Sequence, residues 1–113
     1  MEDELVADGR VVRIVARGRT SGQARAVDVG YVAEPDGSLL VAANDPTTAW
    51  ARNLLADPAC RVTLGRATFD AVAEPLERED HVRAIRALIL RYGTPSEDLG
   101  RGPSFRLRRT VHG

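Results

Sequence analysis

The sequence predicts a small α+β fold: a six-stranded antiparallel β-barrel, closed or nearly closed, with two main helices. Several short segments alternate apolar and polar residues with the period of two that is typical of strands, and one longer segment near the C-terminal end has helical periodicity. The 113 residues suit one domain, 1–113, with its own core. Closing the sheet of so small a domain removes exposed strand edges, which favours a barrel.

The first two predicted strands cover residues 11–17 and 25–33. In the first, Val12, Ile14 and Ala16 share one face, and arginines lie on the other. Residues 18–22 between the strands carry two glycines and two hydroxyl residues, a composition typical of turns. We therefore expect these two strands to pair antiparallel.

A third predicted strand and a short helix follow. Residues 34–37 carry proline and glycine at turn positions, and residues 39–43 form an apolar run that predicts a buried strand. Residues 44–48 offer side chains that cap helices, so residues 49–56 are predicted as a helix with Trp50, Asn53 and Leu54 on one side.

The C-terminal half predicts a hairpin, a helix and a closing strand. Residues 61–64 and 67–73 flank a Gly-Arg turn, which indicates a hairpin. Residues 78–92 have helical periodicity and are followed by Gly93, a typical helix terminator. Their apolar stripe consists of Val82, Ile85, Leu88, Ile89 and Tyr92. Residues 94–103 are expected to be irregular, and Phe105 and Leu107 alternate with arginines in the last strand.

Composition excludes several function classes. Sixteen basic residues balance sixteen acidic ones and only five residues are aromatic, so nucleic acid is not expected as a partner. One cysteine and two distant histidines predict neither a metal site nor a disulfide. All basic residues are arginine, which excludes a Schiff-base lysine. No apolar run is long enough for a transmembrane segment, so we expect a cytoplasmic protein in a reducing compartment.

Arginines gather in two zones that contain no acid, residues 9–27 and 101–109. Within the first zone, the segment GRTSGQAR puts Arg19 in a turn and Arg25 at the head of the returning strand, with Thr20, Ser21 and Gly22 between them. Such a turn concentrates hydrogen-bond donors and can hold a phosphate or a carboxylate. A solvated hairpin turn is the alternative for this segment taken alone.

No residue is predicted to be catalytic. Ser21 lacks the spacing of a nucleophile elbow, Cys60 is expected to be buried, and His81 is expected to be solvated. Trp50 and Asn53, one helical turn apart, would reach the same region, where an indole can flank a flat ring. An enzyme without reactive groups of its own needs a cofactor to supply the chemistry.

The residues that carry a family resemblance are VVRIVARGRTSGQARAVDVGY at 11–31, LLVAAN at 39–44, WARNLLADP at 50–58 and RVTL at 61–64. In this order and spacing they resemble the deazaflavin-dependent nitroreductase family, relatives of the flavin-binding split β-barrels. The resemblance covers roughly residues 10–110. It rests mainly on the G-R-x-S-G-x-x-R loop and the W-x-x-N-L-x-x-x-P helix.

The resemblance implies a split barrel that binds coenzyme F-420, whose reduced 8-hydroxy-5-deazaflavin ring delivers hydride to quinones, nitroaromatics or activated alkenes. The small-molecule electron acceptor is then the partner. Arg19, Ser21 and Arg25 match the positions that hold the phosphate and the oligoglutamate tail. The residues that match the ring-lining positions are Ala43, Asn44, Trp50 and Asn53.

Three departures from the family keep alternatives open. Thr20 stands where the family usually has lysine, and Asp28 stands where a proline usually contacts the ring. The segment between Asn44 and Trp50 lacks a glycine-rich insertion and in this is similar to the pyridoxamine-phosphate-oxidase-like barrels, so FMN is the alternative cofactor. A carrier of flavin, haem or lipid without activity is a second alternative. Both a monomer and a homodimer are compatible with the resemblance, and Tyr92 is assigned either to the core or to the substrate side.

Overall fold

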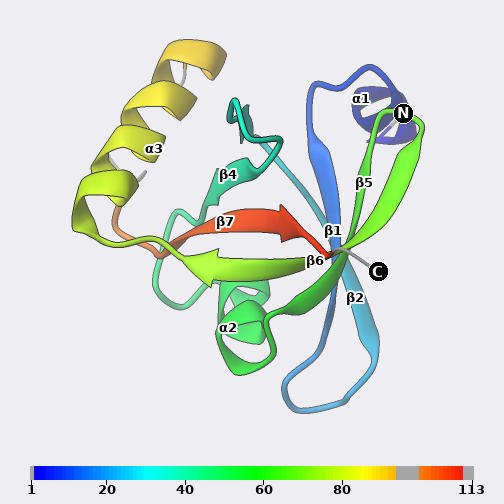
Figure 1. The fold of residues 1–113 in the computed structure, drawn as a ribbon. Coiled ribbons are helices and arrows are strands. Elements are labelled where there is room, and N and C mark those ends of the chain that lie inside the picture. The colour runs from blue at the N-terminus through cyan, green and yellow to red at the C-terminus, as the bar shows by residue number, and fades with distance from the viewer. Residues whose placement is uncertain (1, 94–99, 111–113) are drawn as a thin grey trace.

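The computed structural model describes residues 2–93 and 100–110, and these form three helices and seven strands (Figure 1). In chain order they are α1 (Glu2–Ala7), β1 (Val12–Arg17), β2 (Ala24–Val29), β3 (Val32–Ala33), β4 (Leu39–Ala42), α2 (Ala49–Ala56), β5 (Ala59–Leu64), β6 (Ala67–Pro75), α3 (Arg78–Tyr92) and β7 (Ser104–Arg109). The strands form one antiparallel sheet in the order β2-β1-β5-β6-β7-β4-β3. The predicted α+β class is confirmed, whereas the prediction of six strands is wrong.

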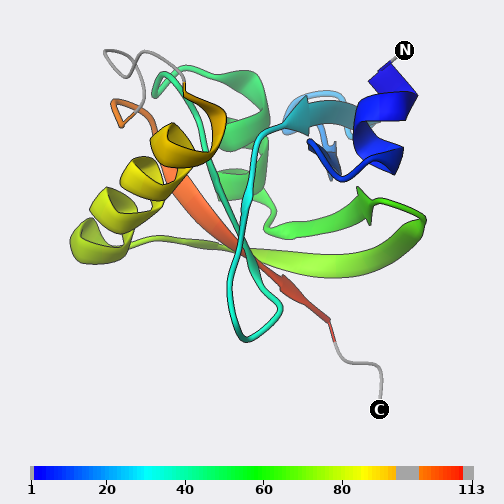
Figure 2. The ribbon, with the colours of Figure 1, turned by 90° about the horizontal axis from the view of Figure 1, so that it is seen from above.

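The additional strand arises because residues 25–33, which were predicted as a single strand, form parts of two separate strands, β2 and β3. β2 ends at Val29, and β3 pairs with β4 through Val32 opposite Leu40. Only Gly30 and Tyr31 separate β2 from β3 in the chain, yet the two strands lie at opposite ends of the sheet. The sheet therefore has to curl until its two ends approach each other, which gives a half-barrel (Figures 1 and 2).

Helix α1 is absent from the sequence-based prediction of two main helices. Its six residues are too few to show a helical period, and a helix of this length is unstable by itself. Tertiary contacts hold it, since Val6 is buried and its carbonyl oxygen accepts a 2.9 Å hydrogen bond from the backbone N–H of Gly65. The helix thus packs against the turn between β5 and β6.

The two predicted helices have the expected bounds. α2 buries Asn53 and Leu54 on one side, as predicted, and α3 ends at Gly93, whose φ of 64° is left-handed. The apolar stripe of α3 is narrower than predicted, because Leu88 is buried but Val82 is 50% exposed. α3 packs against β3, β4 and β7 along only one side (Figure 1).

The hydrophobic core lies between the sheet and α2. Period-two strands supply most of it, as the pattern of β1 predicts, and α2 contributes Leu54. The largest fully buried side chains of this core cluster are those of Phe105, Ile14, Leu54, Leu107, Val12, Val41 and Val62, whereas Leu40 is fully buried outside this cluster. Leu107 and Phe105 belong to the predicted closing strand, which the structure places between β6 and β4.

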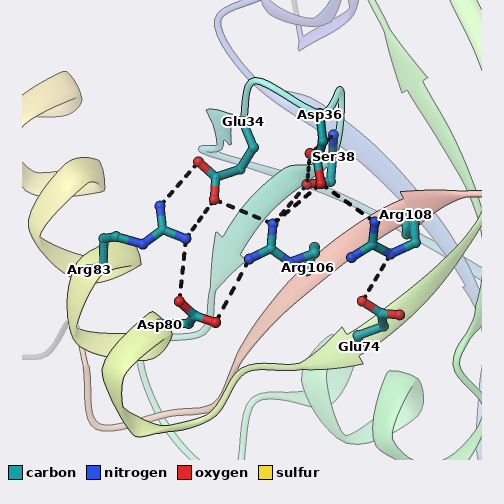
Figure 3. A network of polar contacts seen from close by, with 8 residues as sticks. All are labelled: Glu34, Asp36, Ser38, Glu74, Asp80, Arg83, Arg106 and Arg108. Carbon is teal, nitrogen blue, oxygen red and sulfur yellow. Dashed lines mark hydrogen bonds and ion pairs between the residues drawn. The ribbon is translucent and has the colours of Figure 1, made fainter.

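A network of ion pairs ties α3 to the sheet (Figure 3). Arg83 of α3 donates to both carboxylate oxygens of Glu34, at 2.7 and 3.1 Å. Arg106 of β7 donates to Glu34 at 3.4 Å and to Ser38 Oγ at 3.0 Å, and Asp80 lies 3.4 Å from Arg83. The side chains of Arg106 and Glu34 are only 14% and 12% exposed, so water screens this part of the network weakly.

No helix within the described part of the chain is long and apolar enough to cross a membrane.

The pH dependence of stability tests the Glu34 network. The hydrogen bond from Arg83 is the largest cause that lowers the pKa of Glu34 below its ordinary 4.5, with the charges of Arg83 and Arg106 adding to it. A lowered folded-state pKa means that the contribution is complete above about 4.5 and is lost as the pH falls through the folded value. At pH 7 we expect Glu34→Gln to lower the free energy of unfolding by about 1–3 kcal/mol.

Urea unfolding of the wild type and of Glu34→Gln at pH 7 and pH 3 measures this difference, which should shrink at pH 3. Glu4→Gln, at an exposed position of α1, is the control and should change stability little at either pH. A difference that is as large at pH 3 as at pH 7 would contradict a role for the Glu34 charge.

Candidate functional site

The turn between β1 and β2 has a shape set by short local contacts. The backbone N–H of Gly18 donates to Gln23 O and that of Gly22 donates to Gly18 O, both at 2.8 Å. Ser21 Oγ accepts from the Gln23 N–H at 3.2 Å. A Cβ at Gly18 would lie 2.8 Å from Ser21 Oγ and 3.3 Å from Gln23 O, so a side chain here would force Ser21 to move. The predicted donor-rich turn is therefore a defined structure.

Arg19 joins this turn to α2. Its Nη1 donates to Asn53 Oδ1 at 2.8 Å, and its backbone N–H donates to the same oxygen at 3.2 Å. Asn53 is only 5% exposed, so its side-chain amide oxygen, Oδ1, needs hydrogen-bond partners within the protein. Arg19, 34 positions away in the chain, supplies both of these hydrogen bonds. Asn53 thus holds Arg19 in place at the edge of the helix.

A cavity of about 470 Å³ lies between the turn and α2; we call it the loop cavity. Its volume is in the range of small-molecule sites. Two arginine and three hydroxyl side chains line it together with apolar residues of β1 and β2. The lining residues are Ile14, Ala16, Gly18, Arg19, Thr20, Ser21, Arg25, Ala26, Val27, Thr48, Ala49, Trp50 and Asn53. Such a set of donors suits an anionic group.

A second cavity of about 370 Å³, the Tyr92 cavity, lies where β2 ends and α3 comes close. Its walls are mostly apolar or aromatic, with few polar groups. They consist of Val11, Asp28, Val29, Gly30, Ala42, Asn44, Thr48, Trp50, Leu88 and Tyr92. A flat, largely apolar ligand suits these walls.

The two cavities adjoin along Thr48 and Trp50, which line both. The half-buried indole of Trp50 packs against Phe105 of the core, with ring centroids 6.0 Å apart and an angle of 52° between the rings. The core thereby fixes the wall between the cavities. One elongated ligand with an anionic end and a flat end would fit this pair of cavities.

Tyr92 closes one side of its cavity against the crossing from β2 to β3. Its hydroxyl oxygen accepts from the Tyr31 N–H at 3.0 Å and donates to Arg10 O at 2.8 Å. A Cβ at Gly30 would lie 3.0 Å from the Tyr92 ring. Arg91 lies over the Tyr31 ring, 4.5 Å from its centroid. The end of α3 is therefore anchored to the sheet beside the cavity.

The structure brings most of the predicted site residues together. Eight of the ten line the two cavities: Arg19, Thr20, Ser21, Arg25, Asp28, Asn44, Trp50 and Asn53. Ala43 is 1% exposed within the core cluster, and Gly22 faces a separate groove beside Cys60. Sequence reasoning did not assign Thr48, Gly30 or most of the apolar lining residues to the site. The position of Thr48 and Gly30 next to the ends of elements was a weak signal for these two.

Two other residues with reactive side chains lie apart from the cavities. Burial, with smaller contributions from the charges of Asp57 and Asp70, raises the pKa of the Cys60 thiol to about 11, so it is a poor nucleophile at neutral pH. His81 was expected to be solvated, and this is wrong: it is half-buried, with Nδ1 2.6 Å from Ser104 Oγ and Nε2 3.1 Å from Gly100 O. These bonds connect α3 with the start of β7. His112 lies outside the described residues.

Within residues 2–93 and 100–110, no group of three or more His, Cys, Asp or Glu side chains is arranged to hold a metal ion.

A family model for the F420H(2)-dependent quinone reductases matches residues 6–96, which is most of the chain. The chain belongs to this family. The match covers both cavity-lining elements, the β1–β2 turn and α2, as well as α3. It confirms the resemblance to the deazaflavin-dependent reductases and leaves only α1 in part and β7 outside the matched range.

Solved structures agree with the family assignment. An F420-H2 dependent reductase, FDR-A, is 25% identical with a TM-score of 0.74 over 88% of this chain and 94% of its own. A domain-swapped dimer is 22% identical with a TM-score of 0.74, over 94% and 92% of the two chains. The haem storage protein HutZ from Vibrio cholerae is 20% identical with a TM-score of 0.68, over 97% and 88%. The last two likenesses concern the fold alone. No curated protein matches the chain.

The contact between Gly30 and Tyr92 can be tested with a double-mutant cycle. We expect Gly30→Ala to lower the free energy of unfolding by about 1–3 kcal/mol, because the added Cβ meets the Tyr92 ring. In a Tyr92→Ala background, the same substitution should lower the free energy of unfolding by much less, because the ring that the added Cβ meets is absent. Urea unfolding measures all four variants.

Leu90→Ala provides the control background, since Leu90 is 81% exposed on the same helix. In the Leu90→Ala background, Gly30→Ala should lower the free energy of unfolding by as much as it does in the wild type. An equal cost in the Tyr92→Ala background would contradict the packing of Tyr92 on Gly30.

Proposed function

We propose that this protein is a reductase that uses coenzyme F-420 and transfers hydride to a small electron acceptor such as a quinone, a nitroaromatic or an activated alkene. The observation that carries the proposal is the pair of adjoining cavities with different chemistry, in a chain that belongs to the F420H(2)-dependent quinone reductase family. Membership supports the cofactor class, and the cavities support the way in which this chain would hold it.

The residues fit the two ends of the coenzyme. Arg19, Arg25 and Ser21 line the loop cavity and would hold the phosphate and the acidic tail. Trp50 and Asn44 line the Tyr92 cavity and would flank the ring. Thr20 cannot supply the charge of a lysine, but its hydroxyl remains a donor in the loop cavity.

When bound, the reduced deazaflavin supplies the hydride, and the chain's own residues bind and orient. Asn53 fixes the guanidinium of Arg19 through the 2.8 Å hydrogen bond, so that the loop is ordered before a ligand arrives. Trp50, held by Phe105, keeps the ring end of the site in a constant shape. Such preorganisation would orient the bound ring for hydride transfer, and the role proposed for these residues is positioning.

We also propose that the protein forms a homodimer. The domain-swapped dimer among the similar structures supports this proposal. Light scattering on the purified protein measures the mass, and a monomer across the working concentration range would contradict it.

Titration with coenzyme F-420, followed by the fluorescence of Trp50, tests the binding site. Trp50 is the single tryptophan of the chain and lines both cavities. Arg19→Ala and Arg25→Ala should each weaken binding about 10- to 100-fold, because each removes a charge-assisted contact to an anionic group. Arg66→Ala, at the exposed turn between β5 and β6, is the matched control and should bind as the wild type does.

Competing outcomes separate the alternatives. Preference for FMN over coenzyme F-420 would contradict the cofactor assignment. Binding of the reduced coenzyme without its oxidation by menadione or a nitroaromatic would contradict the reductase and favour a carrier.

A further inference from the structure

Asp28 differs from the other residues of the Tyr92 cavity in its charge. Among the lining residues that the structure describes, it is the one with a formally charged side chain. Its carboxylate receives hydrogen bonds from Arg13 Nε at 2.8 Å and from Arg13 Nη2 at 3.1 Å. The two residues lie directly opposite each other on β1 and β2, and the Asp28 side chain is 20% exposed.

Arg13 holds the carboxylate without lining the cavity itself. The bidentate geometry uses one acceptor position on each carboxylate oxygen and fixes the side chain of Asp28. Because Asp28 lines the cavity and Arg13 does not, the charge nearest to a ligand is negative. Arg13 reduces this negative potential but does not cancel it at short range.

We propose that Asp28, held by Arg13, tunes the redox balance of the ring in the Tyr92 cavity, favouring its oxidised form and thereby hydride donation. This inference rests on the proposed function, since it takes the flat end of the site as the ring end.

The charge balance of hydride transfer gives the reason. A hydride, which is one proton with two electrons, leaves the reduced ring and forms a bond to the acceptor, which takes a further proton from water where its product needs one. The donor is the anionic form of the reduced ring, which has already released one ring N–H proton to water, so the loss of hydride makes this ring neutral and leaves no further proton to be released. A carboxylate beside the ring stabilises the more positive form relative to the more negative one, so Asp28 makes hydride loss more favourable.

The ratio of two affinities tests this proposal without turnover. Dissociation constants of oxidised and of reduced coenzyme F-420 are measured anaerobically, with no acceptor present, for the wild type and for Asp28→Asn. Asparagine has the same shape and no charge. We expect the variant to shift the ratio about tenfold toward tighter binding of the reduced form. A purely structural role of Asp28 would weaken both forms alike and leave the ratio unchanged.

Two further variants sharpen the test. Arg13→Gln leaves the carboxylate without its guanidinium and should shift the ratio in the opposite direction, toward the oxidised form. Asp70→Asn is the matched control: Asp70 also forms a cross-strand ion pair with an arginine, Arg61, at 3.3 Å, but lines neither cavity. It should leave the ratio unchanged. If Asp28→Asn fails to fold, as judged by thermal unfolding, the affinity ratio of Arg13→Gln tests the proposal instead: a shift toward the oxidised form supports it, and an unchanged ratio overturns it.

The outcomes distinguish the inference from the proposed function. An unchanged ratio in Asp28→Asn, with the coenzyme still bound, overturns the inference alone. If the wild type binds FMN and not coenzyme F-420, the proposed cofactor fails, and the same ratio with oxidised and reduced FMN still tests Asp28. Binding of neither ring overturns both.

Discussion

The connection from β2 to β3 through Gly30 and Tyr31 is the constraint on which the rest of this structure depends. It sends the chain from one end of the sheet to the other within two residues, so the sheet has to curl. The curl brings the end of β2 close to α3, where Tyr92 packs on Gly30 and bonds to the Tyr31 backbone. The Tyr92 cavity exists because these elements meet without closing the barrel completely.

The division of the site into two cavities follows from which elements border it. The β1–β2 turn supplies arginine and hydroxyl groups, and the end of β2 with α3 supplies apolar and aromatic ones. α2 lies between them and carries Trp50, the common wall, and Asn53, the anchor of Arg19. In the proposed function, the charged end and the flat end of the coenzyme would contact different parts of the chain, and Asp28 borders only the cavity for the flat end.

Helix α3 is positioned from both of its ends. Near its N-terminal end Arg83 and Asp80 join the Glu34 network (Figure 3). At its C-terminal end the Tyr92 hydroxyl bonds to the backbone of Arg10, just before β1, and of Tyr31, between β2 and β3. Between them only one side of the helix is buried, so much of its outer surface is exposed. Polar contacts at both ends, together with the buried Ala84 and Leu88 between them, thus position the Tyr92 wall relative to β2.

The sequence by itself determined the strand and helix periods, the bounds of α2 and α3, and the family, because these depend on local patterns of apolar residues, turns and motifs. Eight of the ten residues that the sequence assigned to the site line the two cavities in the structure. Only the tertiary structure decided that residues 25–33 break into two strands, that His81 is half-buried and that Arg19 binds Asn53. These depend on contacts between positions far apart in the chain, which local periodicity does not encode. For the same reason α1, whose six residues are held by the β5–β6 turn, leaves no signal in its own sequence.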